Sequence, residues 1–113
     1  MIKLVFKKRN EEIIGFTCNG HSGYASEGSD IVCAAISTLV QNVEICLSEV
    51  LKIKLSLERD DKIAKFNLKL AKNVNHEEIL KAQPIFKSFQ ISSQRIEKQY
   101  KKYFKVEDEN EII

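Results

Sequence analysis

Several residue types are scarce in this sequence, and each scarcity excludes a class of protein. Trp is absent, and the 113 residues include one Pro and four Gly, which are too few for a flexible linker. Three Cys form an odd number without the spacing of a disulfide framework. They indicate reduced thiols and therefore a cytoplasmic protein.

Strong charge of one sign and long apolar runs are also missing. The 18 basic and 16 acidic residues leave a net charge of +2, which by itself does not indicate a nucleic-acid partner. No uninterrupted apolar run approaches the roughly 20 residues of a membrane-spanning helix, so we expect no membrane association. The N-terminal MIKLVFKKRN places its charges after a very short apolar run, unlike a secretory signal. The length fits a single domain, residues 1–113.

Alternation of apolar and polar residues predicts four strands. In the first, Ile2, Leu4 and Phe6 share one face. The second follows a turn at Asn10 and Glu11, and the third and fourth form a hairpin around Asp60 and Asp61. The expected ranges are 1–9, 12–19, 52–58 and 62–71.

Two helices complete the expected fold. The first spans 30–51, and its apolar residues recur at helical spacing. They are Ile31, Ala34, Ala35, Thr38, Leu39, Val43, Cys46, Leu47 and Val50. Asn75 can cap the second, in which Pro84 either kinks a helix over 76–102 or marks the first turn of a helix beginning near 83.

The order of elements is ββαββα, with or without a short final strand over 104–107, and we expect the acidic end, 107–111, to be frayed. This order predicts an α+β domain with two helices packed on a largely antiparallel sheet of four or five strands.

The stretch 20–37 carries the strongest chemical signal. It reads GHSGYASEGSDIVCAAIS, a glycine-rich loop that leads into the first predicted helix. Asp30 is placed to cap that helix, so Cys33 falls in its first turn, where unpaired amides and the helix dipole favour thiolate over thiol. His21 lies twelve residues earlier, and closing a loop of that size costs only a few kcal/mol. Cys33 and His21 are therefore a candidate nucleophile and base.

The same stretch resembles the signature of the ribosomal-processing cysteine protease (Prp) family, roughly G-H-A-G followed by G-x-D-I-V-C-A-A-V-S. Ser22 stands where Ala is usual and Ile36 where Val is usual. The matching residues are Gly20, His21, Gly23, Gly28, Asp30, Ile31, Val32, Cys33, Ala34, Ala35 and Ser37.

The resemblance implies a cysteine endopeptidase that removes the N-terminal extension of large-subunit ribosomal protein twenty-seven, after large apolar residues such as Phe. It implies His21 and Cys33 as the catalytic pair, Asp30 and Ser37 as supporting residues, and a homodimer. We expect no metal or organic cofactor.

The loop and the helix start leave three questions open. The loop, with Gly20, Ser22, Gly23, Tyr24 and Gly28, can close over an extended peptide or be an ordinary mobile surface loop. First-turn amides are candidate oxyanion donors, but capping by the Asp30 side chain would occupy the Cys33 amide. Asp30 therefore either caps the helix or orients His21. Ser37 either faces the site or bonds back to the Cys33 carbonyl.

Two rival functions have a basis in the residues. Cys18, His21 and Cys33 supply three possible zinc ligands, although paired C-x-x-C spacing is missing. A non-catalytic ribosome-assembly or RNA-binding module is the other, because lysines and aromatic residues interleave near the C-terminus. They are Lys98, Tyr100, Lys101, Lys102, Tyr103, Phe104 and Lys105. The plainer interpretations are that Cys18 and Cys46 are core residues and that these lysines complement a helix dipole.

Overall fold

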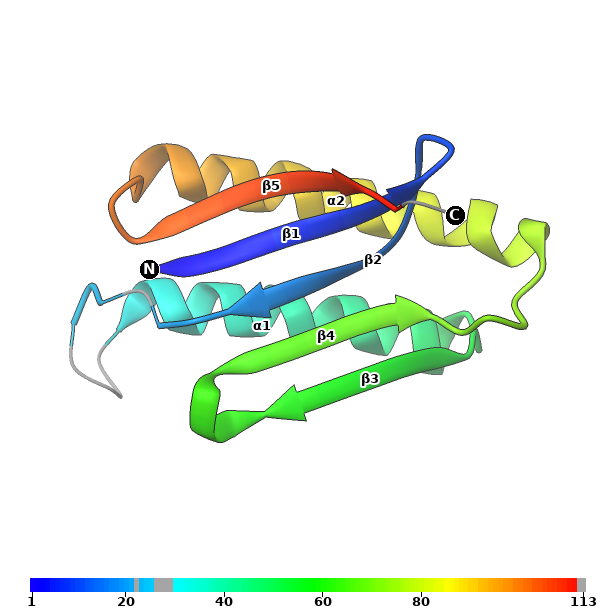
Figure 1. The fold of residues 1–113 in the computed structure, drawn as a ribbon, viewed down its shortest axis with the longest axis horizontal. Helices are drawn as coiled ribbons and strands as arrows, with labels where there is room; N and C mark the ends of the chain where they lie inside the picture. The colour runs from blue at the N-terminus through cyan, green and yellow to red at the C-terminus, as the bar shows by residue number, and fades with distance from the viewer. Residues whose placement is uncertain (22, 26–29, 112–113) are drawn as a thin grey trace.

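The computed structural model describes residues 1–21, 23–25 and 30–111, which form one mixed sheet with two helices on one of its faces (Figure 1). The sheet order is β3-β4-β2-β1-β5. Neighbouring strands are antiparallel except β1 and β5, which are parallel. The predicted α+β class is confirmed, and the optional final strand is present. The elements are β1 Ile2–Arg9, β2 Glu12–Asn19, α1 Ile31–Ile45, β3 Leu55–Asp60, β4 Lys65–Leu70, α2 His76–Gln99 and β5 Phe104–Asn110.

The β1–β2 hairpin forms where alternation predicted it. Asn10 and Glu11 both have positive φ, 51° and 67°, which suits a two-residue turn between right-twisted strands. One detail departs from simple alternation, because the register shifts after Lys7 and leaves Ile14 as an extra residue on β2. Ile13 and Ile14 are consequently both buried.

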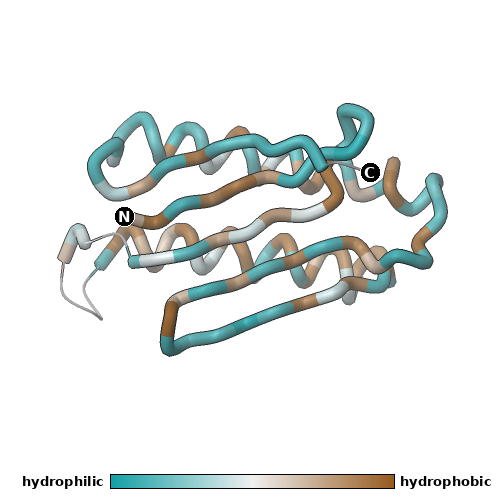
Figure 2. The backbone as a smooth tube through the Cα atoms, viewed as in Figure 1, coloured by the Kyte–Doolittle hydropathy of each residue, from teal (hydrophilic) through white to brown (hydrophobic). Residues whose placement is uncertain are grey.

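The core lies between the sheet and the helices. Phe89 of α2 packs edge-on against Phe6 and Phe16, with ring centroids 5.4 and 4.9 Å apart. Figure 2 shows the matching pattern along the chain, with hydrophobic residues recurring on β1 and on both helices. This cluster fixes the helices on the sheet, and with them the place where α1 begins.

The buried side of α1 matches the prediction only in part, at Val43 and Leu47. Its buried residues are Val32, Ile36, Val40 and Val43, followed by Leu47 in the π-helical turn Cys46–Val50 that continues α1. Ile31, Ala34 and Thr38, which the prediction placed on the core side, are exposed. The helix is apolar on most sides, so helical spacing alone could not identify which side meets the sheet.

The expectation that no segment is apolar enough to span a membrane also needs correction. The helix over Ile31–Val50 is long and apolar enough by length and composition, with a mean hydropathy of 1.6 and 28% of the apolar window buried. A core helix of a soluble protein passes the same test. Here one side of the helix supplies core residues beneath the sheet.

The β3–β4 hairpin is confirmed, but both strands begin later than predicted. Lys52 has a positive φ of 59°, and regular pairing starts only at Leu55. After β3, Asp60 caps the short 3-10 turn Asp61–Ile63, and Ala64 is left-handed. This turn occupies residues that the prediction assigned to the fourth strand.

The helix α2 begins at the predicted cap and runs through its proline. Asn75 Oδ1 accepts from the Glu78 amide at 2.8 Å, and Glu78 Oε1 accepts from the Asn75 amide at 3.1 Å. Of the two alternatives for Pro84, a helix starting near 83 is wrong, since Pro84 lies within a continuous helix that ends at Gln99. Buried Gln83 ties this part of α2 to the sheet, because its side chain bonds both backbone groups of Ile13 at 2.8 Å.

The prediction that 107–111 is frayed is wrong. These residues form or directly follow β5, and the Glu111 amide donates to the Lys8 carbonyl at 2.7 Å.

The carboxylates of this segment are held by lysines. Hydrogen bonds from Lys105 and, to a smaller extent, from Lys3 lower the pKa of Glu107. A hydrogen bond from Lys69 lowers the pKa of Glu111. Four cross-strand ion pairs accompany the pairing: Lys3–Glu107 at 3.3 Å, Lys7–Glu109 at 2.7 Å, Lys8–Asp108 at 3.1 Å and Arg9–Glu111 at 2.8 Å.

Candidate active site

The start of α1 is capped as the sequence predicted. Asp30 is extended, and its Oδ1 accepts from the amides of Val32 and Cys33, both at 3.0 Å. The first turn contains no acidic residue. Of the two roles left open for Asp30, the structure shows capping. Both amides are thereby engaged, so they are not open to a substrate oxyanion while the Asp30 side chain holds this position.

Cys33 lies on the flank of the first turn, between core and surface. Its side chain is partly buried and packs against the core cluster. Ser37, one turn later, is exposed. The sequence left open a hydrogen bond from Ser37 to the Cys33 carbonyl. The corresponding bond is present one residue later, where Thr38 Oγ1 donates to the Ala34 carbonyl at 2.9 Å. The sulfur is therefore neither sealed in the core nor fully open to solvent.

His21 follows a constrained glycine at the end of β2. Gly20 has a φ of +94°, and a Cβ there would lie 2.4 Å from the Met1 carbonyl oxygen. Its amide donates to the Ala64 carbonyl at 2.8 Å. Any larger residue would break this close approach. The exposed His21 is thus placed where the chain leaves the sheet.

The end of β2 and the start of α1 lie at the same end of the molecule (Figure 1). The other histidine is remote from this end. His76 Nε2 lies 3.0 Å from a carboxylate oxygen of Glu12, at the opposite end of β2. Eight residues of strand separate the two places, which is about 25 Å. Of the two histidines, only His21 is therefore at the end of the sheet where α1 begins.

Cys18, near the end of β2, adjoins this region. Burial raises the pKa of the Cys18 thiol to about 11, and the nearby Cys33 adds to the shift. Cys18 consequently stays protonated at neutral pH. Cys46, in contrast with its predicted core role, is partly exposed, and its thiol lies 3.7 Å from Asn42 Oδ1.

The zinc hypothesis gains no support from the geometry. No three His, Cys, Asp or Glu side chains come together as metal ligands within residues 1–21, 23–25 and 30–111. Cys18, His21 and Cys33, the three ligands that the sequence suggested, all belong to these ranges.

Two aromatic residues at this end, Tyr100 and Tyr103, were not predicted as part of the protease site. The Tyr24 ring stacks on Tyr103, with centroids 5.2 Å apart and planes at 20°, and it lies 5.6 Å from the Tyr100 ring. The loop is thereby fastened to the segment between α2 and β5. The lysines and aromatic residues that interleave near the C-terminus drew attention to Tyr100 and Tyr103, but not to a contact with Tyr24. Two further loop residues of the prediction, Ser22 and Gly28, lie outside the described residues.

Comparisons with known proteins identify the family and the fold of this chain. The family model described as cysteine protease Prp matches residues 1–105. No curated protein matches the chain at a significant level. A solved structure of SMU.848 from Streptococcus mutans has a TM-score of 0.83 at 23% identity, covering 98% of this chain and 96% of that one.

Two structures of the ribosomal processing protease Prp from S. aureus are similar as well. The complex with a covalently linked product peptide has a TM-score of 0.84 at 23% identity, and the complex with a substrate peptide has 0.79 at 22%. Each comparison covers 96% of this chain and 100% of the other. At these identities the likeness concerns the fold. The family model, however, spans nearly the whole sequence, and the chain therefore belongs to the Prp family of cysteine proteases.

Proposed function

We propose that this protein is a cytoplasmic endopeptidase that removes the N-terminal extension of a large-subunit ribosomal protein twenty-seven precursor. Cys33 is the nucleophile, and His21 is its base and acid. One observation carries the proposal: Cys33 occupies the first turn of α1 at the end of the sheet where His21 emerges, in a chain of a cysteine protease family. The resemblance implies the substrate, and the peptide complexes of the S. aureus relative support a peptide as the ligand.

The chemistry proceeds through two acyl transfers, in each of which His21 takes up one proton and returns it. His21 takes the thiol proton of Cys33, and the sulfur attacks the carbonyl carbon of the scissile peptide bond. The C–N bond then breaks, and the imidazolium gives its proton to the departing amine. A water molecule then loses a proton to His21 and attacks the thioester. The C–S bond breaks with release of the new carboxylic acid, and the imidazolium returns its proton to the Cys33 sulfur.

The negative charge on the carbonyl oxygen must be stabilised at the start of α1. The helix dipole supplies a positive potential there, and the first turn has no carboxylate other than the Asp30 cap. Rotation of the Asp30 side chain would release the amides of Val32 and Cys33 as oxyanion donors. We propose that Asp30 holds this turn in place before substrate binds, with Ser37 beside the site on the same flank.

The loop is proposed to close over the extended peptide and to exclude water. Its members Gly20, Ser22, Gly23, Tyr24 and Gly28 come from the sequence prediction. The stacking of Tyr24 on Tyr103 gives the loop one fixed point. We further propose a homodimer, as the resemblance implies. Light scattering distinguishes the 13.0 kDa chain from a particle of twice that mass.

The decisive experiment incubates the precursor with the wild-type protein and with the Cys33→Ala and His21→Ala variants, followed by intact mass. We expect the wild type to release the extension and both variants to be strongly impaired. Cys46→Ala and His76→Ala are matched controls, because these residues lie away from the start of α1. If Cys33→Ala and His21→Ala cut as fast as the wild type, the assignment of the site is wrong.

A further inference from the structure

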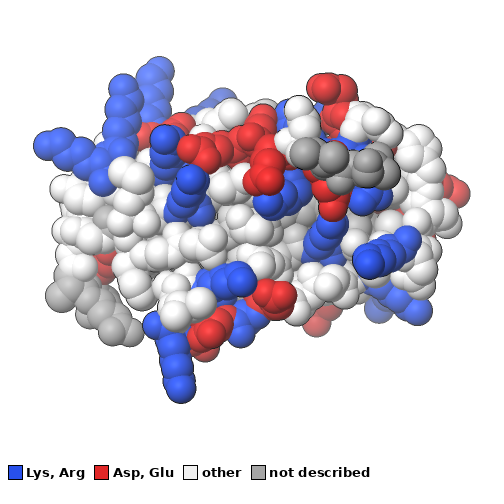
Figure 3. Space-filling view, viewed as in Figure 1, with Lys and Arg blue, Asp and Glu red and all other residues white. Residues whose placement is uncertain are grey.

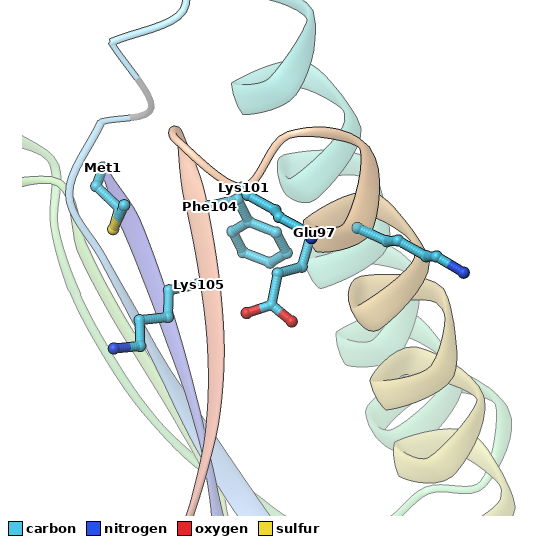
Figure 4. A pocket seen from close by; sticks show the side chains of 6 residues that line it. Met1, Glu97, Lys101, Phe104 and Lys105 are labelled. Carbon is cyan, nitrogen blue, oxygen red and sulfur yellow. The ribbon is translucent and has the colours of Figure 1, made fainter.

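Cations gather where α2 ends and β5 begins. Figure 3 shows Lys and Arg side chains projecting at this end of the molecule. The basic cluster consists of the exposed Lys98, Lys101, Lys102 and Lys105. An open pocket of about 560 Å³ lies among them (Figure 4), and it is lined by Met1, Glu97, Lys98, Lys101, Phe104 and Lys105.

These lysines differ from the cations of the sheet. The basic residues of β1 each have a carboxylate of the C-terminal strand region within 3.3 Å. Lys98, Lys101 and Lys102, by contrast, form no ion pair within the part of the chain that the structure describes. The cations of β1 are thus paired, whereas Lys98, Lys101 and Lys102 are left for a partner.

The acidic groups near the cluster are already engaged. Glu97 Oε2 accepts from the Val106 amide at 2.8 Å. Glu107 is shared between Lys3 and Lys105, at 3.3 and 3.2 Å. Neither carboxylate neutralises the three unpaired lysines.

The helix dipole does not account for these lysines either. It favours cations only within the last turn, and α2 ends at Gln99. Lys98 lies in that turn, but Lys101, Lys102 and Lys105 follow it. The helix dipole therefore accounts for Lys98 at most, and not for the three lysines that follow α2.

Aromatic rings lie beside the cluster. Tyr100 and Tyr103 alternate with its lysines along the chain. Tyr24, with 40% of its surface exposed, stacks on Tyr103 and lies tilted beside Tyr100. Partly exposed rings next to lysines are the combination that binds single-stranded nucleic acid, since bases stack on the rings while the cations contact phosphates. An acidic peptide would use the charges but not the rings.

We propose that the basic cluster, with Tyr100 and Tyr103, binds single-stranded RNA. The surface lies at the same end of the molecule as Cys33, so a bound RNA would lie near the proposed protease site (Figure 1). Binding does not require that site, and a failure of one proposal leaves the other standing.

The test is fluorescence anisotropy with a labelled 12-nucleotide oligouridylate in 50 to 200 mM salt. Three to four phosphate contacts weaken the affinity about 20- to 50-fold over this range. The variant Lys98→Glu/Lys101→Glu/Lys102→Glu should lose at least about tenfold in affinity at 50 mM salt. The control Lys54→Glu/Lys72→Glu/Lys87→Glu makes the same change of charge at exposed lysines outside the cluster and should stay within about twofold of wild type.

Three outcomes would overturn the proposal. The first is the absence of RNA binding at 50 mM salt. The second is an equal loss in both triple variants while circular dichroism shows both folded. The third is displacement of the RNA by oligoglutamate of the same charge as effectively as by unlabelled oligouridylate, which would mean that the rings contribute nothing.

Discussion

The two long helices of this protein begin in different ways. At the start of α2, Asn75 and Glu78 cap each other's amides, and Glu77 and Glu78 place negative charge at the positive end of the dipole. At the start of α1, Asp30 caps alone, no acidic residue occupies the first turn, and Cys33 stands at the position that Glu78 occupies in α2. Both helix starts are capped by a side chain, but only α2 carries carboxylates in its first turn, whereas α1 has a thiol at the corresponding position.

The histidines repeat this contrast. His76, at the first residue of α2, faces Glu12 in an exposed ion pair. His21 lies on the loop before α1, after a glycine that the backbone requires. Exposed pairs contribute little to stability, so His76 should be dispensable. Substitutions at the start of α1 should therefore affect activity, whereas those at the start of α2 should affect only stability.

The largest expected effect comes from the thiol at the start of α1. Cys33→Ala should lower the rate of precursor cleavage by at least about 1,000-fold, because no nucleophile remains. Initial rates with Cys46→Ala should stay within about twofold of wild type. Equal losses in the two variants would show that the thiol at the start of α1 is not specifically the nucleophile.

The next effect separates the two histidines. His21→Ala should slow cleavage about 100- to 10,000-fold, the range for losing a general base and acid, whereas His76→Ala should leave the rate unchanged. Initial rates at saturating precursor measure both. A larger loss in the His76 variant would reverse the comparison.

The two thiols near the start of α1 should also behave differently. With the pKa of Cys18 raised to about 11, iodoacetamide at pH 8 should modify Cys33 well before Cys18, as peptide mapping would show. The folded chain keeps the Cys18 proton between about pH 9 and 11, where the unfolded chain loses it. The free energy of unfolding should therefore fall through this window by on the order of 2 kcal/mol.

Urea unfolding across that window checks the Cys18 effect, with Cys18→Ala as the control. The variant should lack this part of the decline, whatever its absolute stability. Parallel curves for wild type and Cys18→Ala would contradict the raised pKa.

The smallest effects concern the caps. Asn75→Ala should lower the free energy of unfolding by about 1 kcal/mol and leave cleavage unchanged, because the cap of α2 serves only the helix. Asp30→Ala should cost a similar amount. Asp30→Asn keeps a capping oxygen but removes the charge, so unfolding by urea should barely change.

Cleavage by Asp30→Asn distinguishes the two roles considered for this residue. If Asp30 only caps, the variant keeps its activity, since the amide oxygen still holds the first turn. A loss of cleavage in a variant of wild-type stability would mean that the carboxylate orients His21.

Local patterns in the sequence predicted much of this fold. Alternation placed β1 and β2, and capping residues placed the starts of α1 and α2, because these signals lie within a few residues of one another. The buried side of α1 was predicted only in part, since several sides of the helix are apolar. The pairing of β5 with β1 and the stacking of Tyr24 on Tyr103 join distant parts of the chain, and no local pattern records such contacts.

The candidate site was likewise predicted from local patterns only in part. The cap by Asp30 and the position of Cys33 in the first turn follow from neighbouring residues and are confirmed. The pairing of Cys33 with His21 depends on how the loop closes, and it stays a prediction. Cys18 was taken for a core residue, and its nearness to Cys33 appears only when β2 and α1 pack together.

Acid quenching of a reaction between the enzyme and the precursor, followed by intact mass and peptide mapping, tests the central claim most directly. The account predicts a transient adduct on Cys33 whose mass is that of the released extension minus one water, the thioester of the acyl-enzyme, and no adduct or cleavage with Cys33→Ala. Cleavage that continues in Cys33→Ala, or an adduct that maps to Cys18 or Cys46, would contradict it.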